Sequence, residues 1–218
     1  MNFLKRKPID KNFQANLDEL IDQMKATGFL NDKKVEFVIR QTPRHNFVPS
    51  SLQDRAYENG PLPLLSGQTI SQPSVVARMT EWLEIKEGQK ILEIGSGSGW
   101  QCAIIAKLVG NGQIFTVERH ENLANFAKDN LKKSGIKNAY IINGDGRLGL
   151  PRESPYDRII ITAACKDVPK SLFDQLTTDG LLLAPVGENI QSLILFKKTP
   201  KGVVEIKNQS GYVFVPLV

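Results

Sequence analysis

Apolar residues near the start of the chain recur at helical spacing. From Asn16 to Met24 they stand three or four positions apart, which is the spacing of one buried helical face. A second short pattern of this kind runs from Asp32 to Arg40, after which Pro43 and Pro49 exclude a continuous helix. These patterns predict an N-terminal cap of small helices.

The segment from Gly60 to Pro73 has a different character, with several glycines and prolines and few charges. Loops of this length inside compact domains are usually functional or disordered, and disordered segments carry more charge than this one. We therefore expect a functional loop between the cap and a helix predicted from Val75 to Leu83.

From Lys90 onward, short apolar runs alternate with helical stretches. The runs are Ile91–Ile94, Ile114–Val117, Tyr140–Ile142, Arg158–Thr162, Leu181–Ala184, Leu193–Phe196 and Tyr212–Val215. Short apolar strands separated by helices imply crossover connections and a mostly parallel sheet that is covered on both faces. The last two runs lack a helix between them, which predicts an antiparallel end to the sheet with Lys197–Gln209 as a charged connection.

The expected fold class is therefore α/β, a doubly wound and mostly parallel seven-stranded sheet with a small helical N-terminal cap. A length of 218 residues fits one domain. We assign residues 1–74 to the cap and loop, and residues 75–218 to a Rossmann-like core. With 41% hydrophobic and 23% charged residues, the composition excludes disordered and disulfide-stapled chains.

A glycine-rich turn follows Ile91–Ile94 and precedes a helical stretch. Its sequence, Gly95-Ser96-Gly97-Ser98-Gly99, lets the backbone turn tightly and approach a ligand at the carboxyl end of a strand. The dinucleotide fingerprint needs a third glycine where this chain has Trp100, and the Gly-Lys-Ser/Thr of a phosphate-binding loop is missing. The turn therefore predicts a nucleotide-type site of another kind.

Acidic residues end the next two apolar runs. Glu118 follows Gly95 by 23 positions, where a carboxylate can accept both hydrogen bonds of a ribose diol. Asp145, between Gly144 and Gly146, reaches the same sheet edge, and we assign it to an adenine amino group. The alternatives are an exposed strand-end acid for Glu118 and a common Gly-Asp-Gly turn for Asp145.

Preceded by Glu93, the glycine turn resembles motif I of the S-adenosylmethionine-dependent methyltransferases. Further segments are similar to the protein-L-isoaspartate O-methyltransferase family. The segments are Arg44-His45-Asn46-Phe47-Val48-Pro49, Ala56-Tyr57-Glu58, Leu62-Pro63, Gly67-Gln68-Thr69-Ile70-Ser71-Gln72-Pro73, Gly144-Asp145-Gly146 and Phe214-Val215-Pro216-Leu217. Motif I is shared by all such methyltransferases, whereas the Gly67–Pro73 segment and the Val-Pro-Leu ending are peculiar to this family. The match covers nearly the whole chain.

The resemblance implies S-adenosylmethionine as the cofactor and assigns site residues by position. Ser71 falls on the active-site residue of the family. The family's loop that closes over the cofactor falls on Leu65, Ser66, Gly67 and Gln68. Its other cofactor-binding positions fall on Gly95, Gly97, Glu118, Leu123, Asp145, Gly146 and Val218. Leu65, Ser74 and Cys165 depart from the residues usual in the family, and they bear on how tightly the substrate loop closes.

A carboxylate acceptor suits the residues of this loop. With a reference pKa of about 4, a carboxylate is ionised at pH 7 and needs only placement, desolvation and hydrogen-bond donors. Thr69 and Ser71 supply hydroxyls, Thr69 as a substrate-positioning residue, and no histidine or lysine stands beside them. The alternative role for Ser71 is a helix N-cap before Pro73.

The family implies methylation of the free α-carboxylate of L-isoaspartyl residues in damaged proteins and peptides, which starts a repair through a succinimide. Two other interpretations stay open: a methyltransferase acting on RNA or a small molecule, and a catalytically weak member acting as a binding protein. A further rival is a thiolate nucleophile at Cys165, which follows Ala164 rather than the expected proline. A small buried cysteine is the alternative there.

Charge and targeting signals bear on partners and location. Lys and Arg number 28 against 23 acidic residues, but no basic tract dominates, so we expect no nucleic-acid partner. No secretory signal follows Lys5-Arg6-Lys7, and no run approaches the ~18 apolar residues of a membrane span. Two cysteines cannot form a disulfide framework or a four-ligand zinc site. We expect a cytoplasmic monomer with free thiols, no membrane partner and no metal.

Overall fold

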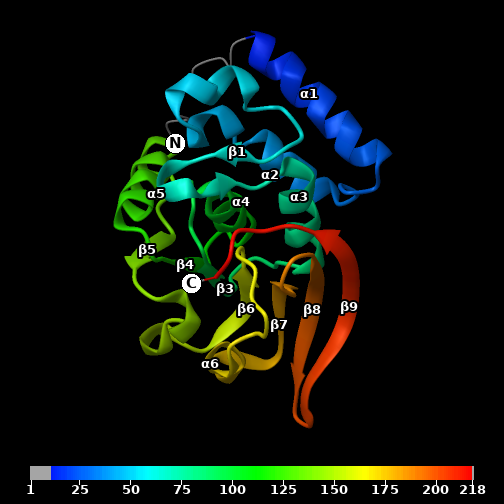
Figure 1. Ribbon diagram of the computed structural model, residues 1–218, viewed down its shortest axis with the longest axis vertical. Helices are drawn as coiled ribbons and strands as arrows, with labels where there is room; N and C mark the ends of the chain where they lie inside the picture. Colours follow the sequence, from blue (N-terminus) through cyan, green and yellow to red (C-terminus); the bar gives the residue numbers. More distant parts are fainter. Residues whose placement is uncertain (1–10, 218) are drawn as a thin grey trace.

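The computed structural model describes residues 11–217 and centres on a seven-stranded sheet of order β5-β4-β3-β6-β7-β8-β9 (Figure 1). Its strands are β3 (Lys90–Ile94), β4 (Gln113–Glu118), β5 (Ala139–Asn143), β6 (Tyr156–Ile161), β7 (Leu176–Val186), β8 (Gln191–Thr199) and β9 (Gly202–Tyr212). Neighbouring strands from β5 to β7 run parallel, whereas β8 runs antiparallel to both β7 and β9. The predicted fold class, including the antiparallel end of the sheet, is confirmed.

The predicted bounds of the last strand are wrong, because β9 ends where the expected strand begins. Thr199 pairs with Gly202, so a tight turn replaces the long charged connection. The Thr199 hydroxyl stabilises this turn by donating to the Gly202 carbonyl oxygen at 2.8 Å. All residues of β9 before Tyr212 are exposed, and an exposed edge strand needs no apolar run that a sequence pattern could reveal.

Helices and short turns complete the fold. The α-helices are α1 (Lys11–Ala26), α2 (Lys33–Arg40), α3 (Pro73–Trp82), α4 (Trp100–Leu108), α5 (Glu121–Lys133) and α6 (Lys170–Asp174). The shorter elements are the 3₁₀ turns η1 (Arg44–Phe47), η2 (Ser50–Arg55), η3 (Leu65–Gly67), η4 (Gly146–Leu148) and η5 (Pro151–Glu153), and a separate ribbon of β1 (Leu62–Pro63) and β2 (Thr69–Ile70). The predicted loop therefore contains a small β-ribbon that its sequence did not indicate.

Two clusters of buried apolar residues lie on the two faces of the sheet. Alternation along β3 places Ile91 in one cluster and Leu92 in the other. The first cluster also contains residues of α3 and α4, and Leu17 and Leu20 enter it from the cap. Shorter elements cover the second face, where Leu172 of α6 is fully buried. The shared first cluster supports a single domain, which stays a prediction, as does its division at residue 74.

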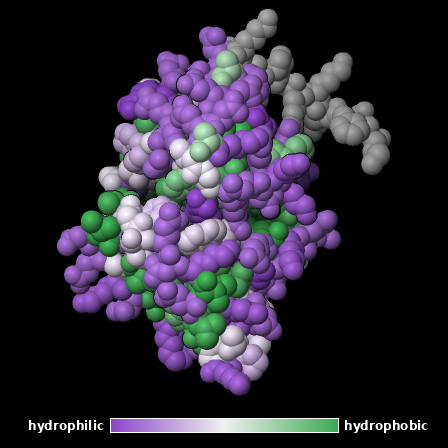
Figure 2. All heavy atoms as spheres, turned by 90° about the vertical axis from the view of Figure 1, so that its right-hand side faces the viewer, coloured by the Kyte–Doolittle hydropathy of each residue, from purple (hydrophilic) through white to green (hydrophobic). Residues whose placement is uncertain are grey.

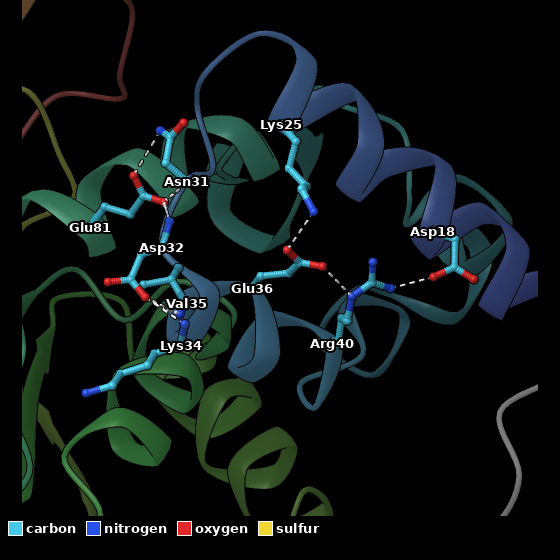
Figure 3. A network of polar contacts seen from close by, with 9 residues as sticks. All are labelled: Asp18, Lys25, Asn31, Asp32, Lys34, Val35, Glu36, Arg40 and Glu81. Carbon is cyan, nitrogen blue, oxygen red and sulfur yellow. Dashed lines mark hydrogen bonds and ion pairs between the residues drawn. The ribbon is translucent and has the colours of Figure 1, made fainter.

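Charged side chains fix the cap helices to one another (Figure 3). Arg40 of α2 bridges Asp18 of α1 and Glu36 of its own helix, and Glu36 accepts from Lys25 at 3.1 Å. Glu81 of α3 accepts backbone N–H donors at the start of α2. Ion pairs therefore join α1 to α2, and hydrogen bonds to Glu81 join the start of α2 to α3. Charges that form a network contribute more than isolated surface pairs.

The carboxyl ends of the parallel strands lie beneath the cap. In Figure 1 the cap elements lie above the sheet, and the C-terminal segment after β9 crosses between them. Ala164 anchors this segment, since its N–H donates to Val215 and its carbonyl accepts from Leu217, both at 2.7 Å. Side chains that follow β3, β4 and β6 therefore meet the loop around Ser71 from below.

The face shown in Figure 2 is mostly hydrophilic, with apolar residues gathered in its lower half, the height at which Figure 1 places the β8–β9 hairpin. Val203, Val204 and Ile206 of β9 are more than 40% exposed. Glu205 and Lys207 stand among them, and such charges protect an edge strand against pairing with other chains. Within the described part of the chain, no helix is long and apolar enough to cross a membrane.

Candidate active site

The glycine turn after β3 forms one wall of a cavity of about 900 Å³, its open mouth included. Gly95 has a φ of +95°, and a Cβ there would lie 2.4 Å from the Thr162 Oγ1. The Thr162 hydroxyl lies 2.9 Å from the Ile94 carbonyl oxygen and 2.8 Å from that of Gly95. Only glycine fits this close approach, so the side chain of Thr162 holds the turn in place.

Glu118, at the end of β4, is 6% exposed and lines the same cavity. Its Oε2 accepts the backbone N–H of Gly97 at 3.0 Å, and its Oε1 accepts that of His120 at 3.0 Å. The two amides fix the carboxylate against the glycine turn. Since a carboxylate has about four acceptor positions, each oxygen can still accept a hydrogen bond from a ligand.

Of the two residues predicted for the site at the end of β5, Asp145 and Gly146, only Gly146 lines the cavity. Gly146 lines the cavity, and a Cβ there would lie 2.4 Å from the Ile94 side chain. The Asp145 carboxylate does not line it, because it accepts from the Arg147 guanidinium at 2.7 Å and caps η4. Hydrogen bonds from Arg147 hold the pKa of Asp145 well below its usual range, at about 2. The adenine role of Asp145 stays a prediction.

The loop from Leu64 to Ile70 lies over the glycine turn. A Cβ on Gly97 would lie 3.9 Å from the Leu64 side chain and from the Thr69 carbonyl oxygen. Ser66 has a φ of 56°, and its hydroxyl donates to Asn122 Oδ1 of α5 at 3.0 Å. This bond joins the outer side of the loop to the helix that follows Glu118, so the loop closes over the cavity from above.

Ser71 lies where this loop enters α3, and it lines the cavity. The N-cap position of α3 belongs to Gln72, so the N-cap alternative for Ser71 is wrong. No protein group within residues 11–217 hydrogen-bonds the Ser71 hydroxyl. The hydroxyl is therefore free to donate to a ligand, and no base is placed to remove its proton.

The structure brings most of the predicted site residues to one cavity. Those that line it are Gln68, Thr69, Ser71, Gly95, Gly97, Glu118, Leu123 and Gly146. Leu65, Ser66 and Gly67 form η3 on the outer side of the loop and do not line it. Val218 lies outside the described residues.

Several residues that line the cavity were not predicted. Trp100 donates its indole N–H to the Thr42 carbonyl oxygen at 2.9 Å, and Gln101 donates to the Thr80 hydroxyl at 2.9 Å. Trp100 and Gln101 directly follow the glycine turn in the sequence, and this position could have predicted that they line the cavity. Thr162 also lines the cavity, and its position at the end of the fourth core strand is a similar signal.

Both cysteines are buried and free. Burial raises the pKa of Cys165 to about 11 and that of Cys102 well above its ordinary value. Neither residue lines the cavity. Within the described residues, no three histidine, cysteine or acidic side chains gather where they could hold a metal ion.

A nucleoside ligand fits the cavity. The left-handed glycines open the backbone to a ligand, and the fixed carboxylate of Glu118 is the acceptor that a ribose diol needs. Leu123 and Ile94 add apolar walls for a base or a methionine chain. S-adenosylmethionine, the cofactor expected from the sequence, meets these requirements.

Comparisons with known proteins identify the family of this chain. The sequence model of the family "Protein-L-isoaspartate(D-aspartate) O-methyltransferase" matches residues 15–218. A protein-L-isoaspartate O-methyltransferase of Methanopyrus kandleri is 44% identical over 212 residues, which is 96% of this chain and 94% of the relative. One from Methanosarcina mazei is 46% identical over 192 residues, 88% of this chain and 79% of the relative.

Solved structures show the same likeness. A protein-L-isoaspartate O-methyltransferase structure superposes with a TM-score of 0.81 at 30% identity, over 92% of this chain and 65% of that one. A structure from Plasmodium falciparum, in complex with S-adenosyl-L-homocysteine, has a TM-score of 0.83 over 93% of this chain and 98% of its own, and at 24% identity it shows the fold alone. Since the family model spans nearly the whole chain, the chain belongs to the protein-L-isoaspartate(D-aspartate) O-methyltransferase family.

Proposed function

We propose that this chain transfers a methyl group from S-adenosylmethionine to the free α-carboxylate of L-isoaspartyl residues in proteins and peptides. The observation that carries the proposal is the Ser71 hydroxyl, which has no hydrogen-bond partner within residues 11–217 and lies in the same cavity as the glycine turn and Glu118. The test is a paired assay of one isoaspartyl peptide and its normal-aspartyl twin. Methyl transfer to the first alone supports the proposal, and equal transfer to both contradicts it.

The cofactor position follows from the residues that line the cavity. Gly95 and Gly97 would lie against its methionine part, and Glu118 would accept from its ribose hydroxyls. Leu123 and Gly146 would border the adenine, with Asp145 as the acceptor for the amino group if its pair with Arg147 opens. When bound, S-adenosylmethionine supplies an electrophilic methyl group on its sulfonium.

The acceptor chemistry needs placement rather than a base. A carboxylate with an ordinary pKa is ionised at pH 7, so the hydroxyls of Ser71 and Thr69 need only orient it and replace part of its water shell. The product is a methyl ester. The next backbone nitrogen of the substrate then displaces methanol to give a succinimide, and its hydrolysis returns some normal aspartate. The enzyme supplies only the first step.

The proposed function also has consequences for partners and location. We infer a monomer that works in the cytoplasm and does not bind nucleic acid. Two free cysteines suit a reducing compartment, and the basic residues do not gather in one tract. An electrophoretic shift of single-stranded RNA at physiological salt would contradict the last part.

Exchange of Glu118 for glutamine should weaken S-adenosylmethionine binding about 5–20-fold. The amide loses the charge that strengthens hydrogen bonds from a ribose diol, and its NH₂ group can no longer accept the backbone N–H that one carboxylate oxygen accepts. The combined loss is roughly 1–2 kcal/mol. Isothermal titration calorimetry measures the change. Glu121→Gln, on the exposed first turn of α5, serves as the control and should bind as the wild type does. Equal affinity in both variants would contradict the ribose role.

Cys165→Ser should retain nearly full methyltransferase activity. The thiol is buried outside the cavity, and a pKa of about 11 leaves it protonated at neutral pH, so it is no nucleophile. Steady-state assays with the isoaspartyl peptide measure the effect. Loss of turnover in a folded variant that still binds S-adenosylmethionine would restore the cysteine nucleophile as the leading mechanism.

A further inference from the structure

Arg44, the first residue of η1, is a buried cation whose hydrogen bonds within residues 11–217 all go to backbone carbonyl oxygens. It is 1% exposed, and no carboxylate of residues 11–217 forms an ion pair with it. Its Nη1 donates to the carbonyl oxygens of Ala56 at 2.7 Å and Glu58 at 3.3 Å, and its Nη2 to those of Gly60 and Ser71, both at 3.0 Å. One guanidinium thus ties the segment before the loop to the backbone of Ser71.

The charge of Arg44 lies directly behind the wall of the cavity. Its Cζ is 5.4 Å from the ring centroid of Trp100, and both Trp100 and Ser71 line the cavity. Burial lowers the pKa of Arg44 to about 10, which leaves the guanidinium protonated at neutral pH. The Glu58 carboxylate, which pairs with Arg55, attracts this cation but forms no ion pair with it. A buried cation attracts an anion more strongly than one in water, because the surroundings screen it less.

We propose that Arg44 is a positioning residue of the methylation reaction. It fixes Ser71 through the Ser71 carbonyl oxygen, and its buried positive charge draws the acceptor carboxylate toward the Ser71 hydroxyl. The inference rests on the proposed function and adds to it the origin of the preference for an anionic acceptor. Nothing in it requires Arg44 to touch the substrate.

The planar fork of arginine is what the four carbonyl oxygens require. Two terminal nitrogens with two N–H groups each reach four acceptors from fixed directions, whereas lysine offers one nitrogen with three donors. Lysine would therefore keep the charge and lose part of the positioning. Methionine, of similar length, would lose both.

The test compares Arg44→Lys and Arg44→Met with the wild type. For each we would measure KM and kcat with an isoaspartyl peptide, and the dissociation constant of S-adenosylmethionine by calorimetry. Arg44→Met should raise the peptide KM about tenfold or more, Arg44→Lys should raise it less, and the cofactor dissociation constant should stay within about twofold in both. If Arg44→Met does not fold, the KM of Arg44→Lys decides.

Arg158→Met is the matched control. Arg158 is also buried and donates to backbone carbonyl oxygens, those of Leu83, Asp157 and Glu84. Unlike Ser71, none of these three residues lines the cavity. Its loss should lower the melting temperature and leave the peptide KM unchanged. An unchanged peptide KM in folded Arg44 variants, or a cofactor dissociation constant that rises in step with KM, would overturn the proposal. A wild type inactive on the isoaspartyl peptide would overturn the proposed function itself.

Discussion

Exchange of Ser71 for alanine should lower the rate of methylation of an isoaspartyl peptide by about 10–100-fold and leave S-adenosylmethionine affinity nearly unchanged. Among residues 11–217 the hydroxyl has no hydrogen-bond partner, and it lines the cavity, so it can donate to the acceptor carboxylate. A hydrogen bond to a charged group contributes roughly 1.5–3 kcal/mol, which corresponds to this loss of rate. Steady-state kinetics with the peptide and calorimetry with the cofactor separate the two effects.

The control for this variant is Ser51→Ala, in the exposed η2 turn of the same cap, which should behave as the wild type. Full activity of Ser71→Ala would show that the hydroxyl does not position the substrate. A covalent adduct on Ser71, trapped in the wild type and seen by mass spectrometry, would show a nucleophile instead. In the part of the chain that the structure describes, no base is hydrogen-bonded to the Ser71 hydroxyl, and an acceptor that is already ionised does not need an activated serine.

The sequence could predict the central strands because they are buried on both faces. Strands such as β3 and β6 then appear as continuous apolar runs between helical stretches, and their ends place Gly95 and Glu118 at one sheet edge. The exposed β9 has no such constraint. Its residues 202–211 look like a charged connection in the sequence, although the backbone pairs with β8 along its length.

Parts of the site depend on contacts that no local pattern contains. The four carbonyl acceptors of Arg44 come from the chain between Ala56 and Gly60 and from Ser71, and only the folded loop brings them together. The contact of Thr162 with the glycine turn also depends on the fold, because Thr162 follows β6 and its hydroxyl donates to the Gly95 carbonyl oxygen. The pair of Asp145 with Arg147 is different, because the two residues are neighbours in sequence and a competing ion pair could have been foreseen.

Glu93, in β3 before the glycine turn, should make the stability of the unliganded protein depend strongly on pH. The residue is fully buried on the face that meets α4. Burial is the main cause that raises the pKa of Glu93 from 4.5 to about 8. The negative charge of Glu118 raises this pKa further, whereas the Thr116 hydroxyl lowers it. At neutral pH the folded protein therefore holds a proton that the unfolded chain has released.

The sign of the effect follows from this proton. Below pH 4.5 the carboxyl is protonated in both states, and its contribution to stability is fully present. Between pH 4.5 and about 8 the contribution is lost at about 1.4 kcal/mol per pH unit, because the unfolded state alone releases the proton. Above that range both states are ionised and the loss stays constant.

Exchange of Glu93 for glutamine should therefore stabilise the protein more at high pH than at low pH. Relative to the wild type, the free energy of unfolding of Glu93→Gln should rise by about 3 kcal/mol between pH 4.5 and pH 7, and level off above pH 8. Urea unfolding of both proteins at a series of pH values measures the difference, with the exposed Glu121→Gln as a control that should follow the wild type. A difference that is constant across this range would mean that Glu93 is ionised in the folded state, and the buried carboxylate would then need a partner that burial alone does not provide.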